Sequence, residues 1–366
     1  MKKKVGFIGW RGMVGSVLLE RMENNGDFNN IDAYFFTTSQ IGSSAPINSK
    51  KNTQLLDAYN INLLSDLDIV ISCQGSDYTN RIHTKLTMVN WKGYWIDAAS
   101  HLRCKKNSII VLDPINKDKI IRGLNNGIKN YIGGNCTVSL MLLAINGLIK
   151  NNLVDWINVM SYQAISGAGA KAMKELLDQQ AFLSKNISDQ NNILTIENKI
   201  RKSILKNDFP INSLNAPLAL NLLPWIDTPM PSGQTKEEWK SMEEANKILD
   251  LENKIKIDGT CVRVPTLRSH SQALTIKLKK SIPLNEIKNL LTHNSPWVKF
   301  VENNKNETYQ YLTPLSVSNT LDIAIGRVRK SLIDKNTINL FTVGDQLLWG
   351  AAEPIRRTLN IIVNET

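Results

Sequence analysis

A glycine-rich turn between a predicted strand and a predicted helix is the feature that most constrains the fold of this chain. The apolar run at residues 4–9 leads into a helical pattern through Gly9, Gly12 and Gly15, which follow a G-x-x-G-x-x-G spacing. Glycine at these positions permits a tight turn, lets backbone N–H groups approach a pyrophosphate, and lets the helix pack closely on the sheet. The turn therefore predicts a dinucleotide-binding βαβ unit at the start of the chain.

The first third of the chain continues this alternation of strands and helices. Apolar runs predict further strands and periodic segments predict helices, with strands at residues 31–39, 67–74, 93–100 and 108–114 and helices at 13–25 and 77–90. Strands that are apolar along their whole length are buried on both faces, as in a parallel sheet covered by helices. We therefore expect an α/β protein whose N-terminal domain is a Rossmann-like parallel sheet.

The pattern changes at Cys136. An apolar helix, a strand and an amphipathic helix are predicted at residues 136–150, 155–166 and 171–185. Residues 261–267 and 269–280 then alternate apolar and polar side chains on either side of a short turn, which predicts antiparallel strands. We expect a second, α+β domain with a mixed or antiparallel sheet. Near the end of the chain, residues 345–363 predict a helix that Pro354 bends.

Length, composition and charge exclude several classes of protein. A chain of 366 residues is long enough for two domains. Its four cysteines lie far apart and its histidines form no cluster, so no zinc site is expected. The net charge is +11, but the lysines are spread out and lack the aromatic-interleaved stripe typical of nucleic-acid binding. We recognise no signal peptide and no apolar run long enough for a bilayer, so we expect a cytoplasmic protein that binds neither nucleic acid nor membrane.

Cys136 stands in the sequence GGNCTV, directly before the apolar helix. A thiol at a helix N-terminus faces free backbone N–H groups and the positive end of the helix dipole, and both favour the thiolate. Free cysteine is also among the most buried and inert residue types. Position alone leaves both interpretations open.

The second predicted strand ends in a sequence that bears on the type of cofactor. An enzyme that uses NAD usually presents Asp or Glu there to the ribose hydroxyls. This chain has Thr38 and Ser39 instead, and Arg11 in the glycine turn adds a positive charge. Because these groups suit a 2′-phosphate, we expect NADP.

A second glycine-rich turn, QAISGAGAK at residues 163–171, ends a predicted strand and opens a predicted helix. Such a turn can hold the nicotinamide end of a cofactor or an anionic substrate. A tight strand-to-helix connection without a ligand explains the same spacing equally well.

Six segments, taken in order, resemble the aspartate-β-semialdehyde dehydrogenases, in particular the form typical of Gram-negative bacteria. They are VGFIGWRGMVGSVL, GGNCTVSLML, SYQAISGAGAK, EEWK, CVRVPTLRSHSQALTIKLKK and FTVGDQLLWGAAEP. The resemblance implies NADPH-dependent reductive dephosphorylation of L-aspartyl-4-phosphate to L-aspartate-4-semialdehyde through a cysteine thioester, a step toward lysine, diaminopimelate, threonine and methionine. It also implies a homodimer with an NADP-binding domain at 1–135, completed by a C-terminal helix at 346–366, and a catalytic and dimerisation domain at 136–345.

The same resemblance implies a role for individual residues. Cys136 matches the family's nucleophile, His270 its base, and Gln163 the side chain that orients the acyl group. The substrate-binding matches are Arg263 for the carboxylate, Glu237 for the ammonium group, and Lys240 and Arg103 for the phosphate. The cofactor-binding matches are Arg11, Gly12, Met13, Val14, Thr38, Ser39, Gln74, Ser166, Gly167 and Gln346.

Two departures from the family pattern and two alternative functions accompany this resemblance. The segment around residues 185–195 is short and lacks a proline, which leaves its cofactor contacts undetermined, and Ala168 replaces a glycine. An N-acetylglutamyl-phosphate reductase, or a nicotinamide-dependent dehydrogenase of a phosphorylated sugar aldehyde, would share the chemistry. An acetylated nitrogen, however, carries no positive charge to pair with Glu237. A Rossmann binding protein without catalysis is disfavoured because Cys136, His270 and Arg263 are all present.

Overall fold

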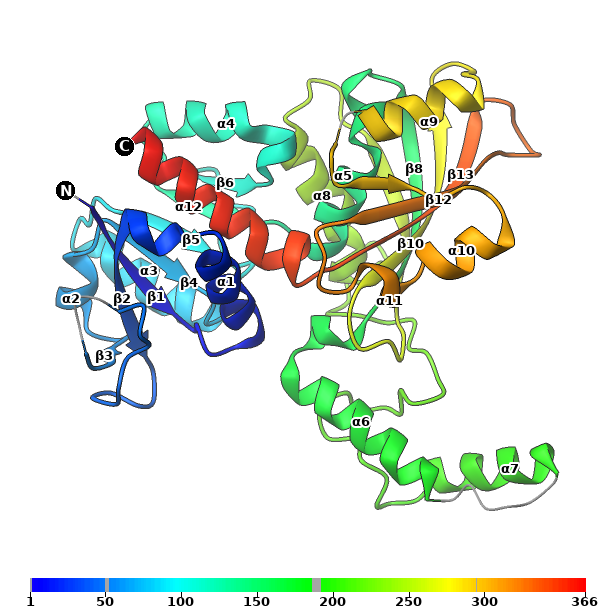
Figure 1. The fold of residues 1–366 in the computed structure, drawn as a ribbon, viewed down its shortest axis with the longest axis horizontal. Helices are drawn as coiled ribbons and strands as arrows, with labels where there is room; N and C mark the ends of the chain where they lie inside the picture. The colour runs from blue at the N-terminus through cyan, green and yellow to red at the C-terminus, as the bar shows by residue number, and fades with distance from the viewer. Residues whose placement is uncertain (1, 50–52, 186–191, 294) are drawn as a thin grey trace.

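The computed structural model describes residues 2–49, 53–185, 192–293 and 295–366, and it places two sheets side by side (Figure 1). In the described residues, the first sheet has seven strands in the order β3-β2-β1-β4-β5-β7-β6, and every pairing in it is parallel. The strands are β1 (Lys3–Ile8), β2 (Ile31–Thr37), β3 (Leu56–Asp57), β4 (Ile69–Ser72), β5 (Tyr94–Asp97), β6 (Ser108–Val111) and β7 (Asn130–Gly133). The expected α/β class and Rossmann-like parallel sheet are confirmed.

Two of these strands were not predicted. β3 has only two residues, and β7 has the sequence NYIG, in which two apolar residues stand between Asn130 and Gly133. β7 matters most for function, because it runs directly into the segment that carries Cys136.

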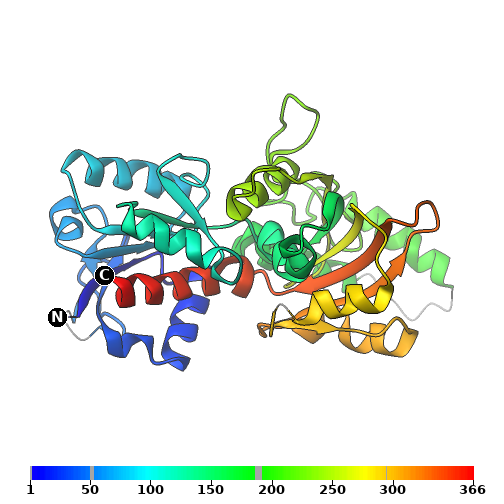
Figure 2. The same cartoon turned by 90° about the horizontal axis from the view of Figure 1, so that it is seen from above.

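Helices cover both faces of the first sheet, and one of them comes from the far end of the chain. They are α1 (Met13–Asn24), α2 (Ile61–Ser65), α3 (Ser76–Met88), α4 (Asp113–Asn125) and α12 (Glu353–Glu365). Figure 2 shows α12 running alongside this sheet, where it contacts β5, β6 and β7. Ile355 and Leu359 bury their side chains there, and Arg356 forms an ion pair with Asp27 at 2.6 Å. The C-terminal helix therefore completes the core of the first sheet.

The predicted terminal helix consists of two parts. A π-helical turn at Leu348–Ala352 comes first, and Pro354 lies in the first turn of α12. Proline is tolerated there because the first N–H groups of a helix have no partner within the helix.

The second sheet is mixed, as expected for the α+β half of the chain. Its strand order within the described residues is β11-β12-β13-β10-β8-β9. The strands are β8 (Val154–Gln163), β9 (Lys256–Arg263), β10 (His270–Leu278), β11 (Val298–Phe300), β12 (Ile323–Lys330) and β13 (Thr337–Gly344), and the associated helices are α5 (Cys136–Lys150), α8 (Lys236–Leu249), α9 (Leu284–His293), α10 (Lys305–Tyr311) and α11 (Pro314–Val317). The almost wholly buried helix α5 packs against the sheet with α9.

The predicted antiparallel pair at 261–267 and 269–280 does not form. β9 pairs in parallel with β8, and β10 pairs with the other edge of β8. The connection crosses the end of β8, where the N–H groups of Val264 and Ile165 donate to the carbonyl oxygens of Gln163 and Thr266. The two strands are therefore separated by β8, and the crossing leaves Arg263 and His270 close to the same strand end.

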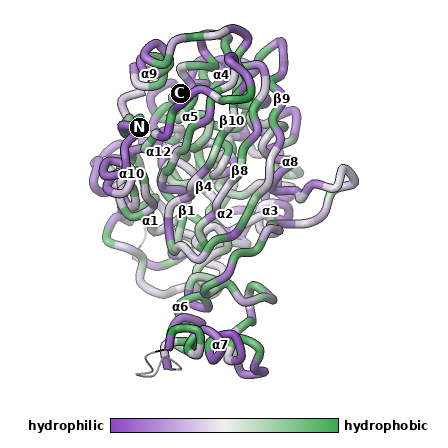
Figure 3. Tube along the Cα trace, turned by 90° about the vertical axis from the view of Figure 1, so that its right-hand side faces the viewer, coloured by the Kyte–Doolittle hydropathy of each residue, from purple (hydrophilic) through white to green (hydrophobic). Residues whose placement is uncertain are grey.

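Two helices, α6 (Ala170–Ser184) and α7 (Ile193–Ile204), extend away from the second sheet as an arm (Figure 3). Buried side chains of α6 anchor the returning chain, because Gln179 accepts hydrogen bonds from the N–H groups of Leu218 and Ala219. Residues 186–191, which include most of the segment with undetermined cofactor contacts, lie outside the described residues. No helix in the described ranges is long and apolar enough to cross a membrane.

Candidate active site

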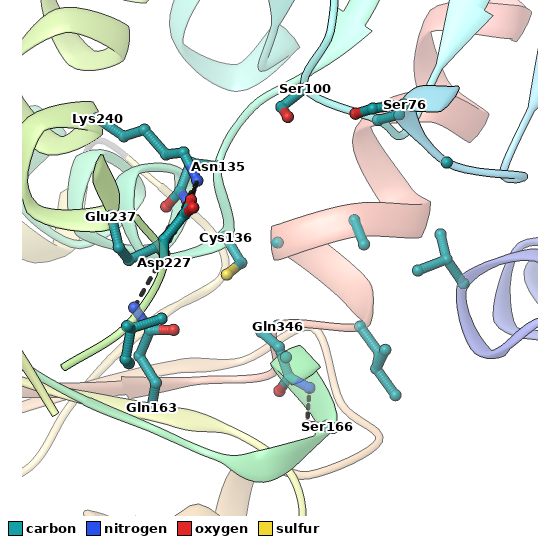
Figure 4. Close-up of a pocket in the computed structure, with 18 of the residues that line it drawn as sticks. Ser76, Ser100, Asn135, Cys136, Gln163, Ser166, Asp227, Glu237, Lys240 and Gln346 are labelled. Carbon is teal, nitrogen blue, oxygen red and sulfur yellow. Dashed lines mark hydrogen bonds and ion pairs between the residues drawn. The ribbon is translucent and has the colours of Figure 1, made fainter. Parts of the chain in front are cut away.

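The N-terminus of α5 brings a cysteine to the junction of the two sheets. β7 leads into Asn135, whose side chain caps the helix by accepting hydrogen bonds from the N–H groups of Thr137 (3.0 Å) and Val138 (3.3 Å). Cys136 is the first residue of the helix and lines a cavity of about 510 Å³. Figure 4 shows its sulfur between the Glu237 and Lys240 group on one side and Gln346 on the other.

The imidazole of His270 contacts this cysteine from behind the cavity wall. His270 is fully buried at the start of β10, and its Nε2 lies 3.2 Å from the Cys136 Sγ. Its Nδ1 accepts a hydrogen bond from the Ala164 N–H at 3.0 Å. A backbone N–H can only donate, so Nδ1 is the unprotonated nitrogen and Nε2 carries the ring proton. The ring thus presents a donor to the sulfur, and it cannot accept the thiol proton at Nε2 without giving up the bond to Ala164.

Burial shifts the pKa of both groups away from their charged forms. Burial raises the pKa of Cys136 to about 12, and the Glu237 carboxylate adds to the rise. Burial also lowers the pKa of His270 to about 3, with a further contribution from the charge of Arg263. Burial therefore opposes the thiolate that the helix N-terminus favours, and it also opposes the charged imidazolium.

The reactivity of the thiol toward iodoacetamide should follow this protonation. Because the pKa of Cys136 is raised, its thiolate fraction is small at pH 7, so alkylation should be slower than that of N-acetylcysteine and should increase about tenfold for each pH unit up to pH 9. Peptide mass spectrometry would follow Cys136, with the exposed Cys104 as an internal control. A rate that is already at its plateau at pH 6 would contradict the raised pKa.

A buried ion-pair cluster forms one wall of the cavity. α8 places Glu237 and Lys240 on one face, where the Glu237 Oε2 accepts from the Lys240 Nζ at 2.9 Å. The Lys240 Nζ also donates to the Asp227 Oδ2 at 2.7 Å, and the Glu237 Oε1 accepts from Asn135 (2.9 Å) and Gln163 (3.0 Å). Burial disfavours the charge on Glu237, but Lys240 and these hydrogen bonds outweigh it and lower the pKa of Glu237. Both groups therefore stay charged inside the cavity.

Two arginines add positive charge to the same cavity. Arg263, the last residue of β9, donates from Nη1 to the Ala164 carbonyl oxygen at 2.8 Å. Arg103, in the loop after β5, donates from Nε to the Gly133 carbonyl oxygen at 2.7 Å. Both guanidinium groups line the cavity with Cys136. The structure thus brings together all of the substrate-binding residues that the sequence indicated.

The glycine turn after β1 has the geometry that a dinucleotide needs. Gly9 has a φ of +72°, and a Cβ there would lie 2.5 Å from the backbone carbonyl carbon of Cys73. A Cβ on Gly15 would lie 2.4 Å from the Gly9 carbonyl oxygen, whereas one on Gly12 would meet only that oxygen, at 3.3 Å. The turn is therefore closed on its sheet side and open at Gly12, where a pyrophosphate could approach the backbone.

The predicted cofactor residues divide between two cavities. A second cavity of about 420 Å³ includes Arg11, Gly12, Thr38 and Gln74 in its lining. Arg11 is held there by Thr37, whose Oγ1 accepts from the Arg11 Nη2 at 2.7 Å, and by the side chain of Gln40. Neither Thr37 nor Gln40 was predicted.

The main cavity contains four more of the predicted cofactor residues, Val14, Ser166, Gly167 and Gln346. The Gln346 side chain donates to the Ser166 hydroxyl and accepts from the Ser269 N–H at 2.8 Å. Met13 and Ser39 are not among the lining residues of either cavity.

Comparisons with known proteins match both halves of this arrangement. The family described as semialdehyde dehydrogenase, NAD binding domain, matches residues 4–122, and the family described as semialdehyde dehydrogenase, dimerisation domain, matches residues 145–349. A solved aspartate semialdehyde dehydrogenase from Francisella tularensis is 55% identical, with a TM-score of 0.97 over 99% of this chain and 100% of the other. The chain belongs to the aspartate semialdehyde dehydrogenase family.

More distant structures share the fold. Aspartate semialdehyde dehydrogenase II from Vibrio cholerae, solved in complex with ASA, is 22% identical with a TM-score of 0.82 over 100% of this chain and 99% of the other. The Candida albicans enzyme, solved with NADP, is 13% identical with a TM-score of 0.67 over the full length of both chains. Membership of the aspartate semialdehyde dehydrogenase family makes this chain an oxidoreductase of amino-acid biosynthesis with a Rossmann domain for a nicotinamide dinucleotide.

Several residues that shape this dehydrogenase site were not predicted from the sequence. Asp227 contacts Lys240, and Glu244 contacts Arg103 at 3.2 Å. Gly350 packs so closely that a Cβ there would lie 2.7 Å from the Cys136 Cβ. Only Asn135 carried a local signal, because Asn before an apolar helix is a typical N-cap.

Proposed function

We propose that the chain reduces L-aspartyl-4-phosphate to L-aspartate-4-semialdehyde with NADPH, through a thioester on Cys136. The observation that carries this proposal is the 3.2 Å contact between Cys136 and His270 at the edge of a cavity lined by two arginines and a lysine. A thiolate suits an acyl phosphate because the thioester it forms accepts hydride far more readily than a carboxylate.

The charges in the cavity orient the substrate. Arg263 presents a planar fork for the α-carboxylate, and Glu237 offers a carboxylate to the α-ammonium group. Arg103 and Lys240 are the cations for the phosphate. Gln163, which donates to Glu237 in the structure, is placed to orient the acyl group. An N-acetylated substrate would offer Glu237 no cationic nitrogen, which supports the aspartyl substrate over its acetylated relative.

The chemistry on Cys136 balances without a charged imidazole. The sulfur attacks the acyl carbon, the bond from carbon to the phosphate oxygen breaks, and the thiol proton passes to the departing phosphate. The Nε2–H of His270 donates to the sulfur and stabilises its negative charge. After reduction of the thioester, the carbon–sulfur bond breaks and the aldehyde is released. The departing thiolate accepts the same hydrogen bond until it takes up one proton from solvent, which restores the thiol. His270 thus acts on sulfur as a hydrogen-bond donor and stays neutral, consistent with its lowered pKa.

The nicotinamide cofactor, when bound, supplies the hydride. Gly12, Met13 and Val14 would hold its pyrophosphate at the start of α1, and Arg11, Thr38 and Ser39 its adenosine end. Gln74, Ser166, Gly167 and Gln346 would line the path to Cys136. The exposed backbone at Gly12 and the cation at Arg11 fit an NADP molecule.

The overall reaction is tested in the reverse direction with purified protein. Oxidation of aspartate semialdehyde should depend on both NADP and inorganic phosphate and should produce NADPH absorbance. Absence of phosphate-dependent turnover, or faster turnover of N-acetylglutamate semialdehyde, would contradict the proposal.

Replacing Thr38 with Asp should move cofactor preference from NADP toward NAD. A carboxylate beside Arg11 would repel the 2′-phosphate and could accept from the free ribose hydroxyls. We expect the ratio of kcat/KM values for NADP and NAD to fall by at least about tenfold. Thr38→Ser is the control, since it keeps the hydroxyl, and an unchanged ratio in Thr38→Asp would place the adenosine pocket elsewhere.

Arg263→Lys and Lys240→Ala should separate the two cationic roles. Arg263→Lys keeps the charge but loses the planar guanidinium group that can bind a carboxylate through two hydrogen bonds. The kcat/KM for the semialdehyde should therefore fall by the equivalent of roughly 1.5–3 kcal/mol. Lys240→Ala should mainly raise the KM for phosphate in the oxidative direction. If each variant instead affects only the other ligand, the substrate lies in the site the other way round.

The open face of the second sheet suits a homodimer. A cavity of about 490 Å³ on this face is lined by Trp156, Met160, Phe341 and their neighbours, and Trp156 and Tyr162 are each 36% exposed. The match to a dimerisation domain supports pairing of two copies through this face.

The proposed domain boundaries follow the same arrangement. An NADP-binding domain covers residues 1–135 and is completed by residues 346–366, and a catalytic and dimerisation domain covers residues 136–345.

A further inference from the structure

One buried carboxylate connects the phosphate side of the cavity to the nucleophile. Glu244 lies on α8 with 2% of its surface exposed. Its Oε1 accepts from the Arg103 Nη1 at 3.2 Å, and its Oε2 accepts from the backbone N–H of Asn135 at 2.7 Å. Asn135 is the N-cap residue of α5 and precedes Cys136. A single side chain thus contacts both a predicted phosphate ligand and the start of the nucleophile's helix.

We propose that Glu244 is a positioning residue that sets the Arg103 guanidinium relative to Cys136 for phosphate binding. This inference rests on the proposed function, in which Arg103 receives the phosphate. Glu244 does not line the cavity, so it acts through Arg103 rather than on the substrate.

The hydrogen bonds of Arg103 show how this orientation works. Its Nε donates to the Gly133 carbonyl oxygen at 2.7 Å and its Nη2 to the Ala98 carbonyl oxygen at 3.3 Å. With Glu244 on Nη1, each of the three nitrogens has one acceptor among the described residues. A guanidinium carries five N–H groups, so one N–H on each Nη is left for an oxyanion. Glu244 fixes the rotation of the plane that presents these two donors.

The second hydrogen bond of Glu244 connects the Arg103 guanidinium to the helix that carries Cys136. In this bond, Glu244 accepts from the backbone N–H of Asn135, the N-cap residue of α5. The side chain of Asn135 also donates to Glu237. Loss of one Glu244 oxygen leaves either Arg103 or Asn135 without its acceptor. A neutral Gln, which has one acceptor oxygen, can serve only one of these two donors.

A double-mutant cycle between Glu244→Gln and Arg103→Gln tests the coupling. In the otherwise unchanged enzyme, Glu244→Gln should raise the KM for phosphate by about tenfold or more, with the KM for the semialdehyde changed less than about threefold. In the Arg103→Gln background, the same substitution should change the phosphate KM by less than about threefold, because no cation is left to position. Glu243→Gln, which removes a neighbouring charge from the same helix, is the matched control and should leave both constants unchanged.

The outcomes separate the inference from the function on which it rests. An unchanged phosphate KM in Arg103→Gln alone would overturn the phosphate role of Arg103. A clear effect of Arg103→Gln, combined with an equal effect of Glu244→Gln in both backgrounds, would show that Glu244 is only structural and would overturn the inference. If Glu244→Gln does not fold, Glu244→Asp takes its place in the cycle, since it keeps the charge but shortens the side chain.

Discussion

Cys136→Ser should fold, bind NADPH and lose nearly all turnover, by a factor on the order of 10³ or more. A serine hydroxyl is far harder to deprotonate than a thiol, and its alkoxide is a much poorer leaving group than a thiolate. Both the attack on the acyl phosphate and the release of the aldehyde are therefore slowed. Steady-state NADPH absorbance measures the loss, and fluorescence titration with NADPH verifies that the cofactor site is intact.

A matched substitution elsewhere isolates the role of this cysteine. Cys104 is exposed and close in sequence to Arg103, yet Cys104→Ser should retain turnover within about twofold, as expected for a surface substitution. Substantial activity of Cys136→Ser in a preparation free of contaminating enzyme would remove Cys136 from its role.

His270→Leu should reduce kcat roughly 10- to 150-fold, the equivalent of about 1.5–3 kcal/mol for a hydrogen bond to a charged group. The leucine fills the space of the ring but cannot donate to the sulfur. His270→Gln restores a donor without a titratable group, so it should recover much of the loss if the ring acts as a donor. Equal loss in both variants would show instead that the ring must exchange a proton.

The pH dependence gives an independent measure of the same role. Because burial lowers the pKa of His270 to about 3, the ring stays neutral above that value, and its protonation should cause no loss of kcat between pH 5 and 8. His293→Gln, a change at an exposed histidine, should behave as the original enzyme throughout this range. An ionisation near pH 6.5 that disappears in His270→Gln would contradict the neutral ring.

Features that depend only on residues near one another in the sequence could be predicted from local sequence patterns. The glycine turn was predictable because close approach between neighbouring segments excludes a Cβ at Gly9 and Gly15. Glu237 and Lys240 pair because their i, i+3 spacing places both on one face of α8. The roles of Cys136, His270 and Arg263 came from the family resemblance, since no spacing in the sequence connects them.

The sequence by itself determined the α/β class, the glycine turn and the helix that begins at Cys136, because apolar periodicity and backbone sterics act over a few residues. Only the tertiary structure decided which distant groups meet and how they are protonated. Arg103 and Glu244 are 141 residues apart, and Cys136 and His270 are 134 apart, so neither contact leaves a local pattern. The dipole at the start of α5 favours a thiolate, whereas burial among distant segments of the chain raises the pKa of the Cys136 thiol.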